Sequence, residues 1–572
     1  MNLQKLEETM MKTRMKKLLA GMCAVLILPI GSAQTVLAEE PEQNFPISVE
    51  KAVNQTLKLW YGSPAKINTA ESSGGEWMQQ SLPLGNGNLG NLIFGGISKE
   101  RIHFNEKTLW TGGPSSSSYQ DFGDIWLDFS AMGITDDNVQ NYRRELNLQT
   151  GIASTEFSYK NVSYKREHFV SSPDQVMVTN LSASEKGKLN FSAKMELNND
   201  NLEGKLTFDV RNQTCTIEGK VKDNDLKFRT TMKLLLTGGE ITADEKNQVY
   251  RIKNADQVTI IMAAETDYKN DYPTYRDKEK NLSNVIDTRI NDSSKKSYDE
   301  LKQTHIEDHQ SLFDRVSLDL GEFQTSVPTD QLIDEYRNGS YSHYLETLAF
   351  QYGRYLTIAG SRGTLPSNLV GLWTVGPSAW TGDYHFNVNV QMNYWPVYST
   401  NLAECGTTFV DYMDKLREPG RLTAERVHGI KGAVDNHTGF TVHTENNPFG
   451  MTAPTNAQEY GWNPTGAAWA VQNLWWHYEF TQDEAYLKNT IYPIMKEAAQ
   501  FWDSYLWTSE YQKINDETSP YHGENRLVAA PSFSEEQGPT AIGTTYDQSL
   551  IWELYNECIQ AGKIVGEDEA VL

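Results

Sequence analysis

The chain has 572 residues, with 51 Lys and Arg against 75 Asp and Glu, and a formal net charge of −24 at pH 7. A length well above about 300 residues predicts more than one domain. The excess of carboxylates argues against nucleic acid or an anionic membrane as partner, because phosphate recognition needs clustered Lys and Arg. With 38% hydrophobic and 11% aromatic residues, the composition is that of a folded chain and not of a disordered one.

Residues 1–38 have the pattern of a secretory signal peptide. Basic residues between positions 12 and 17 precede an apolar run at 18–30 (LLAGMCAVLILPI), and Ala38 before Glu39 fits a cleavage site. The run is short for a membrane span, although an uncleaved anchor stays open as an alternative. We therefore expect bacterial-type export, with the protein secreted or held at the cell surface.

Cysteine usage excludes a dense disulfide framework. Beyond the leader only Cys215, Cys405 and Cys558 remain, each far from the next and outside any CxxC or Cys/His cluster. We interpret them as buried thiols packed as small hydrophobic groups. No metal and no organic cofactor is expected.

Residues 55–280 have the pattern of a large antiparallel β-sandwich. Short segments alternate apolar and polar positions, are rich in Thr, Val and Tyr, and are separated by Asn, Asp and Gly. The clearest of these predicted strands are 158–169, 205–210, 214–220, 227–236 and 257–264. The glycine-rich run at 82–90 (LPLGNGNLG) has the wrong spacing for a dinucleotide fingerprint and is interpreted as a tight loop between strands.

The apolar period shifts to three- and four-residue steps at about residue 283, which predicts a helical linker over 281–325. This linker contains the sequence HIEDH at 305–309. A zinc protease motif needs Glu directly after the first His, whereas Glu307 lies two residues after His305. We interpret these residues as a solvated helix face.

Helices dominate the remainder, 326–572. Apolar residues recur at helical spacing over 341–359, 401–417, 465–480, 484–506 and 547–565. The connections are long and rich in Trp, Tyr, Asn, Gly and Pro, which is typical of functional loops. Helical hairpins with elaborate loops predict an α/α toroid. The predicted fold class is thus multidomain, a β-sandwich followed by a helical toroid.

Two of these loops carry residues suited to sugar chemistry. If the segment around His385, Asn387 and Asn389 is extended, these three side chains point to one face. Amide and imidazole groups pair with sugar hydroxyls or fix a water, and an aromatic ring such as that of Trp395 packs on a sugar face. A capping loop, whose asparagines satisfy backbone groups, is the alternative interpretation.

The second loop, 531–538, has the sequence PSFSEEQG and places Glu535 and Glu536 among Ser, Pro and Gly residues. A glycosidase needs a carboxylic acid that protonates the leaving oxygen, and neighbouring like charges favour the protonated form. Two solvated surface glutamates would give the same pattern. Composition and spacing indicate a sugar-active protein and no more.

The chain resembles glycoside hydrolase family 95, the inverting α-L-fucosidases, from about residue 57 to its end. The motifs that carry the resemblance lie in order along the chain: LPLGNGNLG at 82–90, FGG at 94–96, NEKTLWTGGP at 105–114, LPSNLVGLW at 365–373 and the segment at 385–396. The resemblance implies an N-terminal β-super-sandwich, a helical linker, an (α/α)6 barrel and a small C-terminal β domain. No cofactor is implied.

The resemblance also implies roles for individual residues. Glu536 corresponds to the general acid, Asn387 and Asn389 to the pair that holds the attacking water, and His385 to a histidine that contacts the sugar. Glu535 stands where the family pattern has proline, which leaves open which of the two glutamates acts. The family's activating aspartate lies in an Asp-Gly-Asn type motif, which does not follow Glu536 here. We therefore expect a truncated chain with an incomplete barrel and the catalytic base outside it.

A second departure concerns the specificity of the pocket. Residues 442–448 read VHTENNP where many members have a paired-histidine Asn-Thr-Asp stretch, and His443 and Glu445 are candidate substrate contacts. The leading hypothesis is an exported α-L-fucosidase that acts on fucosylated oligosaccharides or glycoconjugates and needs no obligatory protein partner. An α-L-galactosidase of the same family and an inactive carbohydrate-binding fragment are the alternatives.

Overall fold

The structure is a computed structural model that describes residues 57–66, 76–321, 325–455, 461–534 and 536–572. The predicted leader at 1–38 and Glu535 lie outside these residues. All described residues belong to the unit 55–572.

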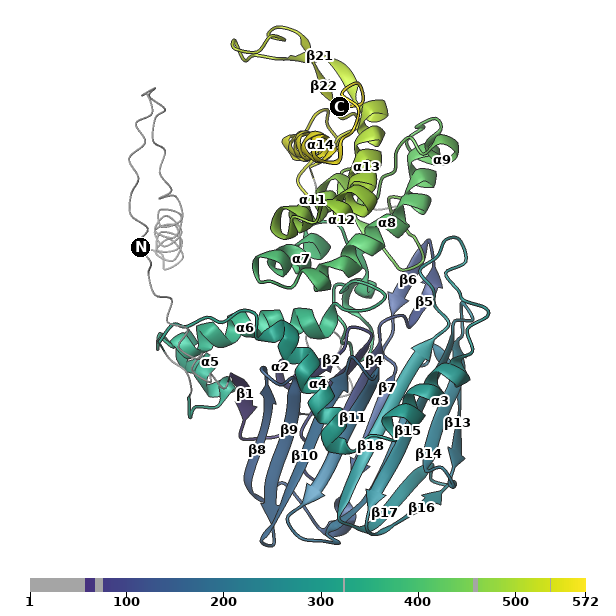
Figure 1. Cartoon of the computed structure of the whole chain (residues 1–572), viewed down its shortest axis with the longest axis vertical. Coiled ribbons are helices and arrows are strands. Elements are labelled where there is room, and N and C mark those ends of the chain that lie inside the picture. The colour runs from purple at the N-terminus through teal and green to yellow at the C-terminus, as the bar shows by residue number, and fades with distance from the viewer. Residues whose placement is uncertain (1–56, 67–75, 322–324, 456–460, 535) are drawn as a thin grey trace, which may run out of the picture. The chain divides into compact units, whose positions relative to one another are not determined.

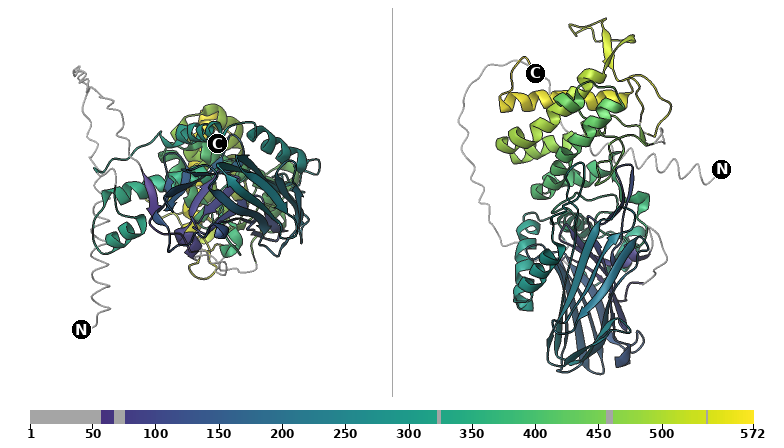
Figure 2. Two further views of the ribbon diagram at one scale, coloured as in Figure 1. Left: turned by 90° about the horizontal axis from the view of Figure 1, so that it is seen from below. Right: turned by 90° about the vertical axis from the view of Figure 1, so that its right-hand side faces the viewer.

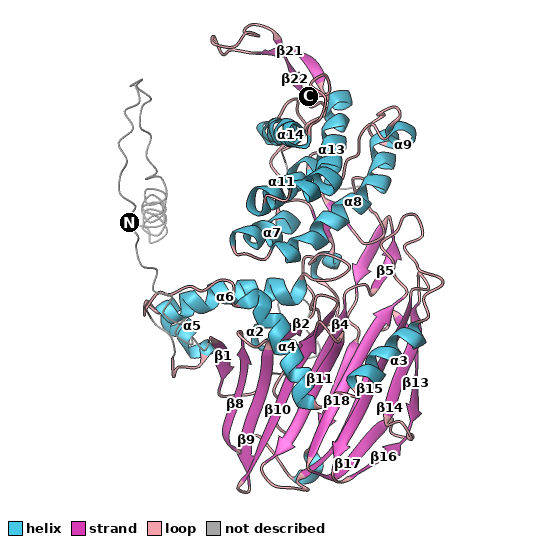
Figure 3. Cartoon of the chain, viewed as in Figure 1, coloured by secondary structure: helices cyan, strands magenta, loops and turns pink. Residues whose placement is uncertain are grey.

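The first half is a sandwich of two antiparallel sheets, as predicted (Figures 1 and 3). The nine-stranded sheet has the order β1 (Lys58–Tyr61), β8 (Gln140–Asn147), β9 (Ile152–Tyr159), β10 (Val162–Ser171), β11 (Val176–Ala183), β18 (Gln257–Thr266), β15 (Lys227–Thr237), β14 (Thr214–Val221) and β13 (Leu202–Asp209). The seven-stranded sheet has the order β16 (Glu240–Asp244), β17 (Val249–Ala255), β12 (Leu189–Leu197), β7 (Gly123–Asp128), β4 (Lys99–Glu106), β3 (Leu89–Ile93) and β2 (Leu82–Gly85). A separate hairpin joins β5 (Trp110–Gly113) to β6 (Ser116–Tyr119).

Alternating burial explains why these segments form strands. In β12, Leu189, Phe191, Ala193 and Met195 are buried while the residues between them are more exposed. Side chains alternate between the two faces of a strand, so such a pattern places one face on the core between the sheets. The predicted segment 158–169 is in fact two strands, because Lys160 and Asn161 adopt positive φ and form the turn between β9 and β10.

Two helices, α3 (Leu282–Ser293) and α4 (Tyr298–Phe313), cover the outer face of the nine-stranded sheet (Figure 1). Ile286, Ile290 and Leu301 pack there against Phe169 and Ile261 in a cluster apart from the main core. The capping box of Ser297 and Glu300 fixes the start of α4. The linker therefore closes the sheet face.

The prediction of a solvated face at 305–309 is wrong for its two histidines. His305 and His309 are buried against the sheet, and their Nε2 atoms contact the carbonyl oxygens of Gly151 at 3.2 Å and Leu148 at 2.8 Å. Burial lowers the pKa of His305 to about 4. Among the described residues, no group of three or more His, Cys, Asp and Glu side chains is placed to hold a metal ion.

The second half is helical. It contains α5 (Thr329–Arg337), α6 (His343–Gly360), α7 (Asn389–Ser399), α8 (Ala403–Arg426), α9 (Ala433–Asn436), α11 (Gly466–Thr481), α12 (Glu484–Tyr486), a π-helical turn (Leu487–Ile491), α13 (Tyr492–Tyr505) and α14 (Thr545–Val565). Of these, α7, α8, α11, α13 and α14 pack on one another (Figure 2). Short elements also occur: α2 (Glu76–Gln80), the 3-10 turns Ser130–Met132 and Ala379–Gly382, the pair β19 (Tyr384–His385) and β20 (Glu445–Asn446), and the hairpin β21 (Trp507–Lys513) and β22 (Asn525–Val528).

Several elements of the second half differ from the sequence prediction. Helices α5 and α7 and the hairpin β21–β22 were not predicted, and the single segment at 484–506 is divided by the π-helical turn. The other long helices match the predicted ranges to within a few residues at their starts. Cys215, Cys405 and Cys558 are buried free thiols, as predicted. No helix within the described ranges is long and apolar enough to cross a membrane.

The end of β4 fastens the sandwich to the segment that follows α6. The buried Lys107 Nζ donates hydrogen bonds to the carbonyl oxygens of Gly360 at 2.6 Å and Leu365 at 2.8 Å. Asn105 Nδ2 donates to Thr374 O at 3.0 Å, and its Oδ1 accepts from Thr374 N. Burial lowers the pKa of Lys107 to about 7, against the opposing charge of Glu106. These bonds fix where the chain leaves the sandwich.

The glycine-rich run at 82–90 is the predicted loop, and it joins β2 to β3 against α6. Gly87 N donates to Ala359 O at 2.8 Å, and Gly87 has φ +91. A Cβ added at Gly87 would lie 2.0 Å from Arg362 O. The position therefore requires glycine, both for its backbone conformation and for the close approach.

Gly87→Ala tests this contact. We expect it to lower the free energy of unfolding by about 2 kcal/mol or more, because the left-handed backbone and the clash both penalise alanine. The matched control is Gly113→Ala in β5, where an added Cβ meets nothing within 4 Å; its change should stay within about 0.5 kcal/mol. Equal denaturant midpoints for the two variants would contradict the assignment.

Candidate active site

The structure brings Glu536 and Asn387 together, although 149 residues separate them in sequence. Asn387 Nδ2 donates a hydrogen bond of 3.1 Å to Glu536 Oε1. Glu536 lies on the exposed loop between β22 and α14 and has φ +58. An uncommon backbone conformation for glutamate in a functional loop is consistent with a side chain that is aimed at a partner.

The segment 383–389 is only partly extended, which corrects the predicted alternation. Strand β19 ends at His385, and Val388 adopts φ +71 before α7 begins at Asn389. A β-branched residue in this region is strained, and the reversal breaks the period-two pattern. His385, Asn387 and Asn389 thus lie on one short stretch but on a strand, a loop and the first turn of a helix.

His385 is held by an acidic neighbour that the sequence analysis did not single out. His385 Nδ1 lies 3.0 Å from Asp383 Oδ2, which is buried. Across the short sheet, Glu445 pairs with His385. Burial raises the pKa of Asp383, and burial followed by the charge of Asp383 raises that of Glu445. The ring of Trp380, 79% exposed, lies 6.4 Å from that of His385.

The candidate contact His443 lies inside the protein. Its side chain is fully buried, its Nε2 lies 3.0 Å from His428 Nε2, and its Nδ1 accepts from Asn463 N at 2.9 Å. Its ring stacks on that of His428 and contacts Trp462. Burial lowers the pKa of His443 well below its usual value, and that of His428 to about 4. Both ring nitrogens of His443 take part in contacts within the protein, so neither is available to a ligand. Its role in this structure is to support its neighbours.

Trp395 is placed apart from this group. It lies on α7 six residues beyond Asn389, 41% exposed. Six residues of α-helix advance about 9 Å and rotate the side chain by about 240°. Trp395 therefore projects from a different face of α7 than Asn389.

Asp547 is not part of any motif in the sequence. In the structure it is fully buried in the first turn of α14 and bonded to Ser532 Oγ at 2.5 Å, within the loop that carries Glu536. Asn463 is also buried and donates from Nδ2 to Phe386 O at 3.2 Å. No spacing pattern in the sequence identifies Asp547 or Asn463 as part of the site, because their hydrogen-bond partners come from distant loops.

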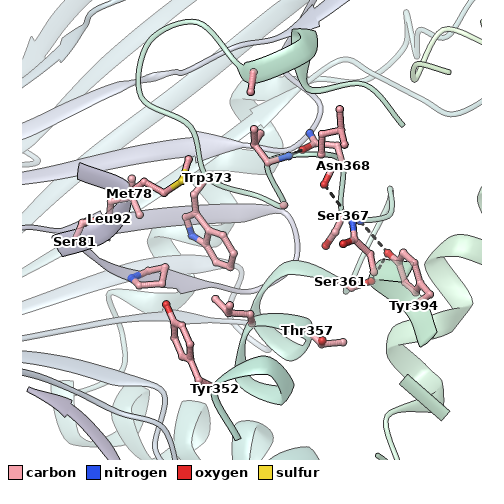
Figure 4. Close-up of a pocket in the computed structure, with 17 residues that line it drawn as sticks. Met78, Ser81, Leu92, Tyr352, Thr357, Ser361, Ser367, Asn368, Trp373 and Tyr394 are labelled. Atoms are coloured by element: carbon pink, nitrogen blue, oxygen red, sulfur yellow. Dashed lines mark hydrogen bonds between the residues drawn. The ribbon is translucent and has the colours of Figure 1, made fainter. Parts of the chain in front are cut away.

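A pocket of about 430 Å³ opens between the sandwich and helices α6 and α7 (Figure 4). Trp373, Tyr352 and Asn368 are among the side chains that line it, and Tyr394 lies at its edge beside Ser361. Neither Asn387 nor Glu536 belongs to its lining. The contact between Asn387 and Glu536 is therefore separate from this pocket.

Comparisons with known proteins show the family to which the chain belongs. Residues 297–572 match the glycosyl hydrolase family 95 catalytic domain, and 59–118 and 114–271 match the glycosyl hydrolase family 65 N-terminal domain. "Probable alpha-fucosidase A" of Aspergillus niger is 32% identical over 574 residues, covering 89% of this chain and 68% of that protein. The chain belongs to glycoside hydrolase family 95.

Other relatives of this family-95 chain extend the comparison. "Alpha-L-fucosidase 2" of Arabidopsis thaliana is 27% identical over 91% of this chain and 66% of its own length. The chain thus spans about two thirds of the length of these relatives. A solved structure, "Putative kojibiose phosphorylase from human microbiome", has a TM-score of 0.59 at 12% identity over 90% of this chain and 69% of its own, which shows a shared fold.

Because His443 is buried and His385 is only half-buried, we expect their substitution by alanine to affect stability differently. His443→Ala should lower the free energy of unfolding by about 2–4 kcal/mol, because it empties a buried stacked site. His385→Ala, at the half-buried rim, should change it by about 1 kcal/mol or less. Urea denaturation measures both. A smaller loss of unfolding free energy for His443→Ala than for His385→Ala would contradict the buried, structural placement of His443.

Proposed function

We propose that the protein hydrolyses terminal α-L-fucosyl linkages in glycans, with inversion at the anomeric carbon. The observation that carries the proposal is the 3.1 Å contact of Asn387 Nδ2 with Glu536 Oε1 in a chain of family 95. We infer fucose as the sugar because the two relatives are a probable α-fucosidase and an α-L-fucosidase by name. Because the chain spans about two thirds of their length, the activity is proposed for the whole protein.

Glu536 is proposed as the general acid and the two asparagines as the holders of the attacking water. The water attacks the anomeric carbon from the face opposite the leaving oxygen while Glu536 donates its proton to that oxygen. The 3.1 Å contact between Asn387 and Glu536 must open to admit the sugar, because the water and the acid lie on opposite faces of its ring. The glycosidic bond breaks and the new C–O bond forms on the other face. The water must give up a proton, and an amide is not a base, so a carboxylate has to accept it. None of the described residues is proposed for that role.

The rim of the site is suited to a hydroxylated ring. His385, held by Asp383, and Glu445 lie opposite one another across β19 and β20. Imidazole and carboxyl groups both bond to sugar hydroxyls, and the exposed Trp380 offers an aromatic face next to them. We propose His385 and Glu445 as substrate contacts.

Glu536→Gln tests the acid. The variant keeps the side-chain shape and the acceptor for Asn387 but cannot donate a proton, so kcat on an unactivated fucoside such as 2′-fucosyllactose should fall about 10²- to 10⁴-fold. The matched control is Glu517→Gln on the exposed β21–β22 hairpin, which should leave kcat unchanged. Near-normal turnover by Glu536→Gln would rule out this assignment.

We further propose that the protein is exported, with the leader removed after Ala38. The support is the basic, apolar and small-residue order of residues 12–38. N-terminal sequencing of the protein recovered outside the producing cell should begin at Glu39. Recovery of the protein only inside the cell, with residues 1–38 intact, would contradict export.

A further inference from the structure

Asp547 joins the loop of Glu536 to another loop of the site. Its Oδ2 accepts a hydrogen bond of 2.5 Å from Ser532 Oγ, four residues before Glu536. Its Oδ1 lies 3.2 Å from Thr465 Oγ1, just before α11 begins. Asp547, Ser532 and Thr465 are all fully buried. One carboxyl group thus links two segments that are 67 residues apart, counted from Thr465 to Ser532.

The hydrogen bonds continue from Thr465 to the segment that carries Asn387. Thr465 Oγ1 lies 2.7 Å from Asn463 Oδ1, and Asn463 Nδ2 donates to Phe386 O at 3.2 Å. Phe386 directly precedes Asn387. The hydrogen-bonded chain Ser532–Asp547–Thr465–Asn463–Phe386 therefore runs from the loop of Glu536, four residues before it, to the residue next to Asn387.

The hydrogen bonds that Thr465 can make depend on whether the carboxyl group of Asp547 is protonated. The hydroxyl of Thr465 carries one proton, yet its oxygen faces two acceptors, Asn463 Oδ1 and Asp547 Oδ1. If Asp547 is protonated on Oδ1, it donates to Thr465 and Thr465 donates to Asn463. If Asp547 is ionised, the Thr465 hydroxyl can donate to only one of the two acceptors. When it donates to Asp547, Asn463 Oδ1 exchanges its 2.7 Å contact with a donor for the longer 3.4 Å bond from Tyr546 OH.

The surroundings of Asp547 are consistent with a proton that is retained into the weakly acidic range. Burial raises the pKa of Asp547 to about 6, with opposing contributions from the hydroxyls of Ser532 and Thr465. The titratable groups that face this region from the packed elements are one imidazole and two phenols. His443 Nδ1 accepts from Asn463 N at 2.9 Å, and burial lowers the pKa of His443 well below its usual value, so its ring stays neutral where Asp547 titrates. Tyr505 of α13 donates to Pro531 O at 2.7 Å, and Tyr546 OH lies 3.4 Å from Asn463 Oδ1.

We propose that Asp547 is a positioning residue that holds the 531–538 loop, and with it Glu536, against the Asn387 segment, and that protonation of its carboxyl tightens this hold. The proposal rests on the proposed function for its catalytic consequence, but its structural part stands on the hydrogen bonds alone. Glu536 is exposed, so little besides its loop and Asn387 determines where its carboxyl lies.

Three variants distinguish the role of the Asp547 carboxyl group from the role of its protonation. Asp547→Asn keeps one acceptor and adds a permanent donor, and therefore imitates the protonated form at every pH. Asp547→Ala removes both links. Ser532→Ala removes only the link to the acid loop and serves if Asp547→Ala fails to fold. The matched control is Asp503→Asn on α13, whose exposed carboxylate accepts from a hydroxyl, Tyr555 OH at 2.9 Å, away from this loop.

The first measurement is amide hydrogen exchange, which does not need catalysis. The amides of Ser532 and Ala541 donate to each other's carbonyl groups and so report on the loop. Corrected for intrinsic rates, their exchange in Asp547→Ala and Ser532→Ala should be about tenfold faster than in the wild type. In the wild type it should accelerate as pH rises through about 6, whereas in Asp547→Asn it should not. Unchanged protection in both Asp547→Ala and Ser532→Ala would overturn the proposal.

The second measurement is hydrolysis of 2′-fucosyllactose by the whole protein. Misplacing the acid should lower kcat of Asp547→Ala about tenfold or more with KM changed less than about threefold, because ground-state contacts remain. Asp547→Asn should retain most of the activity and lose the part of the pH profile near pH 6. Wild-type kcat in Asp547→Ala overturns the positioning role. A wild-type protein that cleaves no fucoside refutes the proposed function instead, while the exchange result still tests the loop.

Discussion

The buried ammonium of Lys107 is the contact on which the placement of the site depends. Lys107 directly follows β4 and donates to the carbonyl oxygens of Gly360, at the end of α6, and of Leu365. Asn105, two residues earlier, bonds to Thr374. Removing one buried partner of such a bond leaves an unpaired carbonyl, which costs about 1–3 kcal/mol. The sandwich thereby acts as a rigid base for the segment 360–383, which leads directly into His385 and Asn387.

The residues of the candidate site and of its hydrogen-bond network lie near the starts of three helices. Asn387 lies two residues before α7, Asn463 and Thr465 precede α11, and Asp547 lies in the first turn of α14. A helix start presents backbone N–H groups and a positive dipole end, which suits hydrogen-bonding and acidic side chains. The acid loop sits among these starts, so its geometry depends on hydrogen bonds between distant loops and not on its own sequence.

Much of the fold could be predicted from the sequence, because burial periodicity of two or three to four residues is local. The sandwich, the linker and the long helices follow from it. The buried faces of His305 and His309 could not be predicted, since a polar residue at a helical spacing has no mark that distinguishes core from surface. Val388 likewise gives no sign of its positive φ, which ends the expected alternation after His385.

The candidate site was predicted where long motifs carry it and not elsewhere. Glu536 and Asn387 were identified by resemblance, and the structure places them 3.1 Å apart. His443 and Glu445 were both predicted as contacts because residues 442–448 depart from the family pattern, yet His443 is buried whereas Glu445, two residues on, is only half-buried. The central claim is an acid and a bound water on opposite faces of the sugar. Proton NMR of the first sugar released from 2′-fucosyllactose by the whole protein tests it most directly: the account predicts β-L-fucose, and α-L-fucose as the first product would contradict it.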